Sequence, residues 1–513
     1  MKKRRFNPVS IPFRIIGIIF KIIFAFIVIA LQIAWIFFAV YYYKNIPFLS
    51  ILSQVFSVIV ACYIYYTNQN VSYKILWIIL IMVFPLAGTT IYLLYGYGKS
   101  APKKRQKQAD AIYLPAIAQN KTIETITDIG DRKIATLLNS LSKFPCYKGA
   151  NVRYYTDGEP MYIEMLKDLK SAKKYIFLET FIIAQGKMWE EIEKILFQKA
   201  DNGVRIYILF DSFGSYKRLK ANTVKRFHHH YNIEMVGFNP IGMKITPALN
   251  HRDHRKLVIV DGLCAYIGGV NFADEYVHYE TRFGFWRDSG ARVEGSSIDS
   301  FIILFCQNWF IATRMLLNPK EFIVVHQNID NDAYIFPFGD TPADMRDPAY
   351  NCCMSLFENA KKSIWISTPY LIVDDEMISV LCRAANSGID VRILVPGIPD
   401  KKIVYTVTRS HYSRLLKNGV KIYEYLPGFN HSKMILTDEK TALIGSINLD
   451  YRSLLLHYEL GALLINSLSA VEMATDFLEA LDKSFLVTEE IYESRTWLQK
   501  LKEFVLNLLA PLM

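Results

Sequence analysis

The first 109 residues of this 513-residue chain contain no acidic side chain, although they hold thirteen Lys or Arg residues. The other 404 residues carry the remaining 46 basic side chains and all 48 acidic ones, a net charge of −2. A nearly neutral body argues against a nucleic-acid-binding surface spread over the fold, so we expect no nucleic-acid partner. Basic residues without acidic neighbours instead indicate charges that flank membrane spans.

Cysteine is sparse as well. The seven cysteines are an odd number and form no CxxC pair. A disulfide framework and a structural zinc site are therefore disfavoured, and a reducing compartment is the simpler interpretation.

Long apolar runs occur only near the N-terminus, at Ile22–Tyr43, Ile46–Tyr66 and Ile75–Gly98. Each is long enough to cross a hydrocarbon core of roughly 30 Å. Basic clusters precede the first run and follow the third. Lys and Arg next to membrane spans favour the cytoplasmic side, and both clusters can lie there only if the number of crossings is even. We therefore expect two or three transmembrane helices, with the first run as the candidate for an interfacial or re-entrant segment, and a large domain that faces the cytoplasm.

The body of the chain is a repeat. The segment AKKYIFLETFII (172–183) is predicted as a strand, a helix follows at 188–203, and VRIYILFD (204–211) is a second strand. The same order returns at 360–372, 376–388 and 391–396, with identical AKK starts and VRI strands. This internal duplication predicts two α/β domains that form a pseudo-dimer with a site between them.

Each half ends in the pattern HxKxxxxD followed by GxxN. A chance match is improbable, and two matches at equivalent places of a repeat are far less probable. These residues form the candidate catalytic and substrate-binding set: His254, Lys256, Asp261 and Asn271 in the first half, and His431, Lys433, Asp438, Ser446 and Asn448 in the second.

The chemistry of this set is that of phosphate transfer. The apolar alternation of KLVIVD and KMILTD predicts strands, on which His and Lys two positions apart share a face. An imidazole can attack phosphorus or donate a proton, and a lysine ammonium neutralises phosphate oxygens. Two such strands supply one histidine as nucleophile and one as acid. We expect no metal or cofactor, because two lysines and two asparagines can hold the developing charge.

Four carboxylates accompany the two histidines. The segments WRDSGARV and HYELGALL align Asp288 with Glu459, and a carboxylate there can hold the other ring nitrogen of a histidine. Asp261 and Asp438 lie five residues beyond the lysines, on the opposite strand face. We expect these two motif residues to act structurally.

The duplicated motif is similar to that of the phospholipase D superfamily. The segments WIILIMVFPLAGTTIYLLYG, HRDHRKLVIVDG, WRDSGARVEG and YEYLPGFNHSKMILTD resemble the bacterial cardiolipin synthases within it. This resemblance implies a multi-pass cell-membrane enzyme with two tandem phospholipase D-like domains on the cytoplasmic side. It implies transfer of a phosphatidyl group between two phosphatidylglycerol molecules, giving cardiolipin and glycerol through a phosphohistidine. Spacing leaves open which histidine is the nucleophile, and the resemblance favours His254.

Other functions use the same residues. A phospholipase that releases phosphatidic acid, or a phosphodiesterase acting on nucleic acid, needs the same two-histidine site. A non-catalytic membrane scaffold is expected to have lost a His or Lys in one half, and both are present here. The sequence does not indicate the oligomeric state. The expected organisation is a membrane anchor (1–100), a linker (101–145), two phospholipase D-like domains (146–335 and 336–488) and a C-terminal amphipathic helix (489–513).

Overall fold

The computed structural model describes residues 30, 34, 47–67, 70–96, 103–117, 121–240, 250–327, 329–343 and 346–512. Contacts divide the chain into two units. The smaller contains the N-terminal helices. The larger comprises Pro102–Asn239 and His251–Pro511, and therefore holds both repeats.

The described helices of the smaller unit are α2 (Pro47–Tyr66), α3 (Val71–Val83), α4 (Pro85–Ile91) and a short π-helix (Tyr92–Gly96). The predicted run Ile75–Gly98 is not one continuous helix, because Pro85 has no N–H to continue the ladder and starts a new helix. The predicted run Ile22–Tyr43 lies outside the described residues apart from two isolated positions. Among the described residues, no helix combines the length and the apolar character needed to cross a membrane.

The first repeat forms a seven-stranded sheet. Its strand order places the duplicated AKK and VRI strands, β3 and β4, side by side and parallel. Along the sheet the strands are β2 (Asn151–Tyr155), β10 (Gly290–Glu294), β8 (Cys264–Gly268), β7 (Leu257–Val260), β3 (Tyr175–Thr180), β4 (Arg205–Asp211) and β5 (Ile233–Phe238). The helices of this repeat are α7 (Gly158–Ser171), α8 (Lys187–Asp201), α9 (Ala221–His229) and α10 (Ile298–Thr313).

The second repeat has the same strand order, which confirms the duplication predicted from the sequence. Its strands are β11 (Tyr334–Asp340), β20 (His457–Ile465), β18 (Thr441–Gly445), β17 (Met434–Thr437), β12 (Ser363–Ser367), β14 (Asp390–Pro396) and β15 (Lys421–Tyr425), flanked by β1 (Tyr147–Lys148) and β21 (Ser484–Val487). Its helices are α11 (Pro348–Asn359), α12 (Asp375–Asn386), α13 (Lys402–Ser410), α14 (Tyr412–Lys417), α15 (Tyr451–Leu455), α16 (Leu468–Asp482), α17 (Glu489–Glu493) and α18 (Trp497–Asn507).

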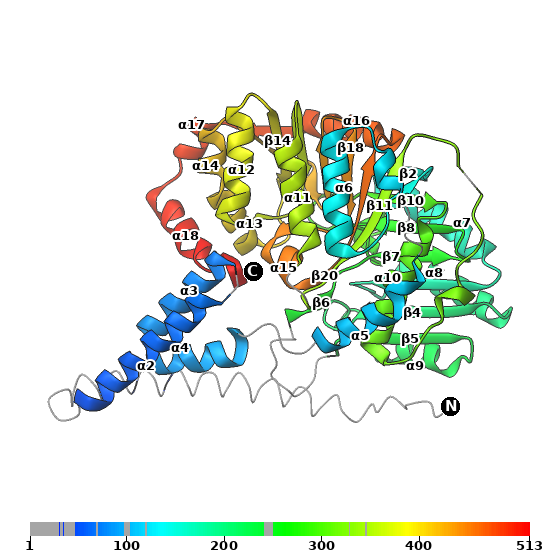
Figure 1. Cartoon of the computed structure of the whole chain (residues 1–513), viewed down its shortest axis with the longest axis horizontal. Helices are drawn as coiled ribbons and strands as arrows, with labels where there is room; N and C mark the ends of the chain where they lie inside the picture. The colour runs from blue at the N-terminus through cyan, green and yellow to red at the C-terminus, as the bar shows by residue number, and fades with distance from the viewer. Residues whose placement is uncertain are drawn as a thin grey trace. The chain divides into compact units, whose positions relative to one another are not determined.

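Helices α5 (Lys103–Tyr113) and α6 (Ile129–Ser142) lie in the segment 101–145, which the sequence assigned to a linker. Their buried side chains recur at helical spacing, for example Ile134 and Leu138. Helix α6 lies beside α11, which itself packs beside α12 over the second sheet (Figure 1). These segments therefore belong to the packed body.

Two short parallel strand pairs connect the repeats. Strand β6 (Arg252–Asp253) of the first repeat pairs with β20 of the second. Strand β9 (Phe285–Arg287) of the first pairs with β16 (Gly428–Asn430) of the second. One hydrophobic core also runs through both repeats, and the almost entirely buried helix α10 lies in it. The two domains therefore fold as one body, and the connecting strand pairs lead directly to both copies of the motif.

Candidate active site

The two motif histidines directly follow the connecting strands. His254 comes after β6, and its backbone N–H donates to the Tyr458 carbonyl at 2.9 Å. His431 comes after β16, and its N–H donates to the Arg287 carbonyl at 2.6 Å. The prediction that His and Lys lie within the motif strands is wrong, since β7 begins at Leu257 and β17 begins only after the second lysine. The backbone of each histidine hydrogen-bonds to the other repeat and so lies outside its own ladder.

The histidines and their carboxylates are exchanged between the repeats. His254 Nδ1 lies 2.9 Å from Glu459 Oε1, and His431 Nδ1 lies 2.6 Å from Asp288 Oδ2. All four side chains are buried. The structure thus brings together the carboxylates that the sequence aligned, but each holds the histidine of the opposite repeat. Neither motif histidine is therefore held by a carboxylate of its own repeat.

The motif lysines are buried beside the histidines. Lys256 Nζ donates to the His254 carbonyl, and Lys433 Nζ donates to the His431 carbonyl. Burial lowers the pKa of Lys256 to about 7 and that of Lys433 to about 8, although Glu459 and Asp288 oppose this shift. A bound phosphate would stabilise the charged form of both lysines.

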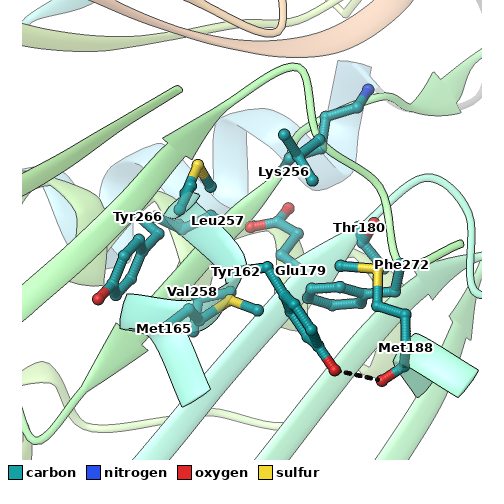
Figure 2. A pocket seen from close by; sticks show the side chains of 12 residues that line it. Tyr162, Met165, Glu179, Thr180, Met188, Lys256, Leu257, Val258, Tyr266 and Phe272 are labelled. Carbon is teal, nitrogen blue, oxygen red and sulfur yellow. Dashed lines mark hydrogen bonds between the residues drawn. The ribbon is translucent and has the colours of Figure 1, made fainter. Parts of the chain in front are cut away.

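The apolar surroundings of Lys256 explain its loss of hydration. A small cavity under the first motif is lined by Lys256, Glu179 and Thr180 together with apolar and aromatic side chains (Figure 2). The Lys256 nitrogen points away from these side chains in this view. The stem of the lysine therefore packs on an apolar wall while its ammonium is left to the site.

Burial also sets the charge state of the histidines. It lowers the pKa of His254 to about 3 and that of His431 to about 4, despite the adjacent carboxylates. Burial raises the pKa of Glu459 and of Asp288, but the neighbouring histidine and lysine charges outweigh it and hold both below their usual range. At neutral pH the site therefore presents neutral imidazoles held by ionised carboxylates, and a neutral imidazole is the nucleophilic form.

The two half-sites differ at the residue after the motif glycine. Ser446 donates to Glu459 Oε2, and Ser453 donates to Oε1 at 2.6 Å. The first repeat has Gly269 at the place of Ser446, and a Cβ there would overlap Asp288 Oδ1. The sequence predicted Ser446 as a phosphate ligand, but the structure directs its hydroxyl to a carboxylate instead.

The motif aspartates bind the backbone at the start of β3 and β12. Asp261 accepts hydrogen bonds from the backbone N–H groups of Lys173, Lys174 and Tyr175, at 2.7–2.8 Å. Asp438 accepts from the equivalent segment of the second repeat, including Ser363 at 3.1 Å. Both carboxylates are therefore occupied with the backbone that precedes β3 and β12.

The two asparagines have different surroundings. Asn271 Oδ1 accepts from the Ile182 N–H at 3.0 Å, and its Nδ2 donates to the Tyr276 hydroxyl at 2.7 Å. Asn448 Oδ1 is buried without a hydrogen-bond partner in the described part of the chain. The side chain of Asn271 is thus occupied by neighbouring elements, whereas Asn448 keeps a free acceptor.

Sequence reasoning missed two residues that contact Glu459, namely Ser453 and His457. Ser453 lies in α15, between the second motif and β20, and His457 is the first residue of β20; a comparison of the repeats alone singles out neither. Among the described residues, His254, His457 and Glu459 form the single group whose ligand atoms lie close enough to hold a metal ion, within 4.8 Å of one another. Positive charge on Lys256 next to them disfavours a cation there.

Comparisons with known proteins agree on one family. Residues 165–282 and 353–481 match the family described as "Cardiolipin synthase, PLD-like domain", and residues 55–96 match "Phospholipase_D-nuclease N-terminal". An uncharacterised protein of Streptococcus mutans is 35% identical over 86% of this chain and 96% of its own length. A cardiolipin synthase of Alkalihalophilus pseudofirmus is 32% identical over 91% of this chain and 94% of its own length.

A solved structure shares the fold. The phosphatidylserine synthase of Haemophilus influenzae superposes with a TM-score of 0.57 at 15% identity, covering 75% of this chain and all of that one. The duplicated fold, the two motifs and the relatives matched over nearly their whole length lead to the same assignment. The chain belongs to the cardiolipin synthase family of phospholipase D-like proteins.

Proposed function

We propose that this chain is a cardiolipin synthase, a phosphatidyltransferase that joins two phosphatidylglycerol molecules into cardiolipin and releases glycerol. One observation carries the proposal: two buried histidine–carboxylate pairs, each built from both repeats, face a common site that also holds two lysines. The cardiolipin synthase relatives support the same reaction.

The first step forms a covalent intermediate. His254 Nε2 attacks the phosphorus of one phosphatidylglycerol, while Glu459 accepts a hydrogen bond from Nδ1–H and balances the imidazolium that forms. The bond from phosphorus to the headgroup oxygen breaks, and His431 donates a proton to this oxygen as glycerol leaves. The negative phosphodiester itself raises the pKa of His431 in the complex and so supplies the acid form.

The second step reverses these roles. His431 takes the proton from a hydroxyl of the second phosphatidylglycerol, whose oxygen attacks phosphorus and releases His254. Lys256 and Lys433 neutralise the phosphate oxygens throughout, and Asn448, whose Oδ1 is a free acceptor, helps to orient the lipid headgroup. Asp261 and Asp438 act on the scaffold, and Asn271 holds the neighbouring loop. Water must be excluded from the intermediate for transfer to exceed hydrolysis.

We place the chain at the cell membrane, with its two domains (146–335 and 336–488) in the cytoplasm. The lack of acidic residues before Asp110 supports this, as do the exposed apolar side chains of α2 and α3, including Phe48, Ile59 and Val83. Both substrates keep their acyl chains in a bilayer, so an enzyme attached there meets them directly.

Product analysis tests the proposed activity. The purified full-length protein is incubated with phosphatidylglycerol vesicles and excess chelator, and the lipids are identified by mass spectrometry. Cardiolipin and glycerol in equal amounts are expected. Phosphatidic acid without cardiolipin would mean that water reaches the intermediate, and a hydrolase would then replace the synthase.

Histidine variants test the mechanism. His254→Ala and His431→Ala should each lower turnover by at least about a thousandfold, because the two residues act as a unit. The thermal unfolding midpoint of each variant serves as the control for correct folding. Wild-type turnover in either variant would contradict the two-histidine mechanism.

A further inference from the structure

A third histidine lies at the active site. His457 is the first residue of β20 and precedes Glu459 by two positions, so both side chains lie on the same face of the strand. The centres of the His457 and His254 rings are 5.4 Å apart, with the rings tilted by 41°. His457 therefore borders the same opening as the proposed nucleophile.

The equivalent residue in the other half-site is not titratable. The segments WRD and HYE align His457 with Trp286. The Trp286 ring lies 5.4 Å from the His431 ring, tilted by 49°. Each motif histidine thus packs beside an aromatic ring at the same distance. The indole nitrogen of Trp286 can only donate a hydrogen bond, whereas a neutral imidazole also accepts one, so His457 adds an acceptor that Trp286 cannot supply.

The surroundings of His457 indicate which nitrogen carries that function. Nδ1 is buried without a hydrogen-bond partner among the described residues, and its nearest carboxylate oxygen, Glu459 Oε1, lies 3.8 Å away and also binds His254. An ionised carboxylate only accepts hydrogen bonds, so it favours the tautomer with hydrogen on Nδ1. The side chain is still 11% exposed although Nδ1 is buried, which places the exposed part at the outer edge of the ring. Nε2 at that edge is then a hydrogen-bond acceptor beside His254.

We infer that His457 forms a headgroup subsite that accepts a hydrogen bond from a non-reacting hydroxyl of the glycerol unit. This inference rests on the proposed function, because it assigns a place to the glycerol that leaves in the first step and to the glycerol unit that arrives in the second. A polyol next to phosphorus has further hydroxyls to donate, whereas a simple alcohol has none left after the reacting one is placed, and the remaining O–H of water lies on the reacting oxygen itself. His457 therefore favours polyol acceptors over water and monohydric alcohols.

Exchange with soluble alcohols tests the subsite in the full-length protein. Phosphatidylglycerol vesicles are mixed with labelled glycerol or with 1-propanol, and kcat/KM for the phosphatidyl product is measured for each alcohol. His457→Phe keeps a ring but removes both nitrogens, and it should lower the preference for glycerol about tenfold through a higher KM for glycerol. His457→Gln places an amide near the Nε2 position and should restore most of the preference. The 1-propanol reaction should change little in either variant.

The outcomes separate this inference from the proposed function. Equal losses on glycerol and 1-propanol in His457→Phe would show a structural role and overturn the subsite, as would an unchanged preference. Hydrolysis by the wild type with no product from either alcohol would overturn both the subsite and the synthase. His326→Phe serves as a matched control, since His326 hydrogen-bonds to Asp299 outside the site and its replacement should leave both rates unchanged.

Discussion

At the scale of single residues, the site depends on carboxylates supplied by the opposite repeat. Glu459→Gln keeps the shape of the side chain but removes the charge that holds His254. We expect turnover to fall by about 10- to 100-fold, and the same for Asp288→Asn at His431. Rapid quenching into denaturing detergent at mildly alkaline pH, where a phosphohistidine survives, measures the covalent intermediate with labelled lipid. Glu459→Gln should slow its formation, because this carboxylate stabilises the nucleophile.

The two carboxylate variants also check that each carboxylate holds the histidine of the opposite repeat. If each carboxylate served its own repeat, Asp288→Asn would be the variant that impairs the nucleophile His254. Asp299→Asn provides a control carboxylate, because Asp299 hydrogen-bonds to a histidine outside the site, His326. Full turnover in Glu459→Gln would contradict the role given to the carboxylate.

A substitution at Gly269 tests how Asp288, one methylene shorter than its counterpart Glu459, is positioned in its half-site. Gly269→Ala puts a Cβ where the Asp288 carboxylate lies, so this carboxylate has to shift away from His431. We expect at least a tenfold loss of turnover, since small displacements of positioning groups are costly. Ser446→Ala in the other half removes a donor to Glu459 without adding bulk, and its effect should be smaller. Steady-state kinetics of the two variants decides this, and an equal or larger loss in Ser446→Ala would contradict the explanation.

At the scale of elements, the motif aspartates fasten the sheet strands. Asp261 has a backbone φ of 53° and collects three backbone N–H groups before β3. Asn adopts this conformation readily, so Asp261→Asn removes the charge with little backbone strain. We predict a loss of about 2 kcal/mol in unfolding free energy. Denaturant unfolding in one detergent measures it, with kcat per folded molecule changed far less.

A surface aspartate gives the comparison. Asp375→Asn removes an exposed partner of Arg414 and should change the stability by less than about 0.5 kcal/mol. If Asp261→Asn abolished turnover while stability stayed at the wild-type value, the aspartate would belong to the chemistry instead.

The duplication and the motif partners were predictable from the sequence because they depend on spacing. The AKK and VRI segments predict the shared strand order, and the aligned WRD and HYE segments predict the carboxylates. Which repeat each carboxylate serves depends on the β6–β20 and β9–β16 pairs, and β6, β9 and β16 are only two or three residues long. Such short segments show no periodicity, so the exchange and the place of His457 were not predictable.

At the scale of the whole molecule, the buried histidines link the stability of the body to pH. Burial lowers the pKa of His254 to about 3 and of His431 to about 4, against about 6.5 in an unfolded chain. Below pH 6.5 the unfolded state binds more protons than the folded state, so stability falls as the pH falls towards 4. Each histidine should cost about 2 kcal/mol between pH 8 and pH 5.

A double variant isolates this contribution. Chemical unfolding of the wild type and of His254→Gln/His431→Gln is compared between pH 5 and pH 8. Buried carboxyl groups such as Glu179, whose pKa is raised by burial, affect both proteins equally and cancel in the difference. The variant should lose about 4 kcal/mol less than the wild type on acidification. Parallel profiles would mean that the two histidines are hydrated in the folded protein. Because one hydrophobic core runs through both repeats, protonation of these histidines should destabilise the two sheets together.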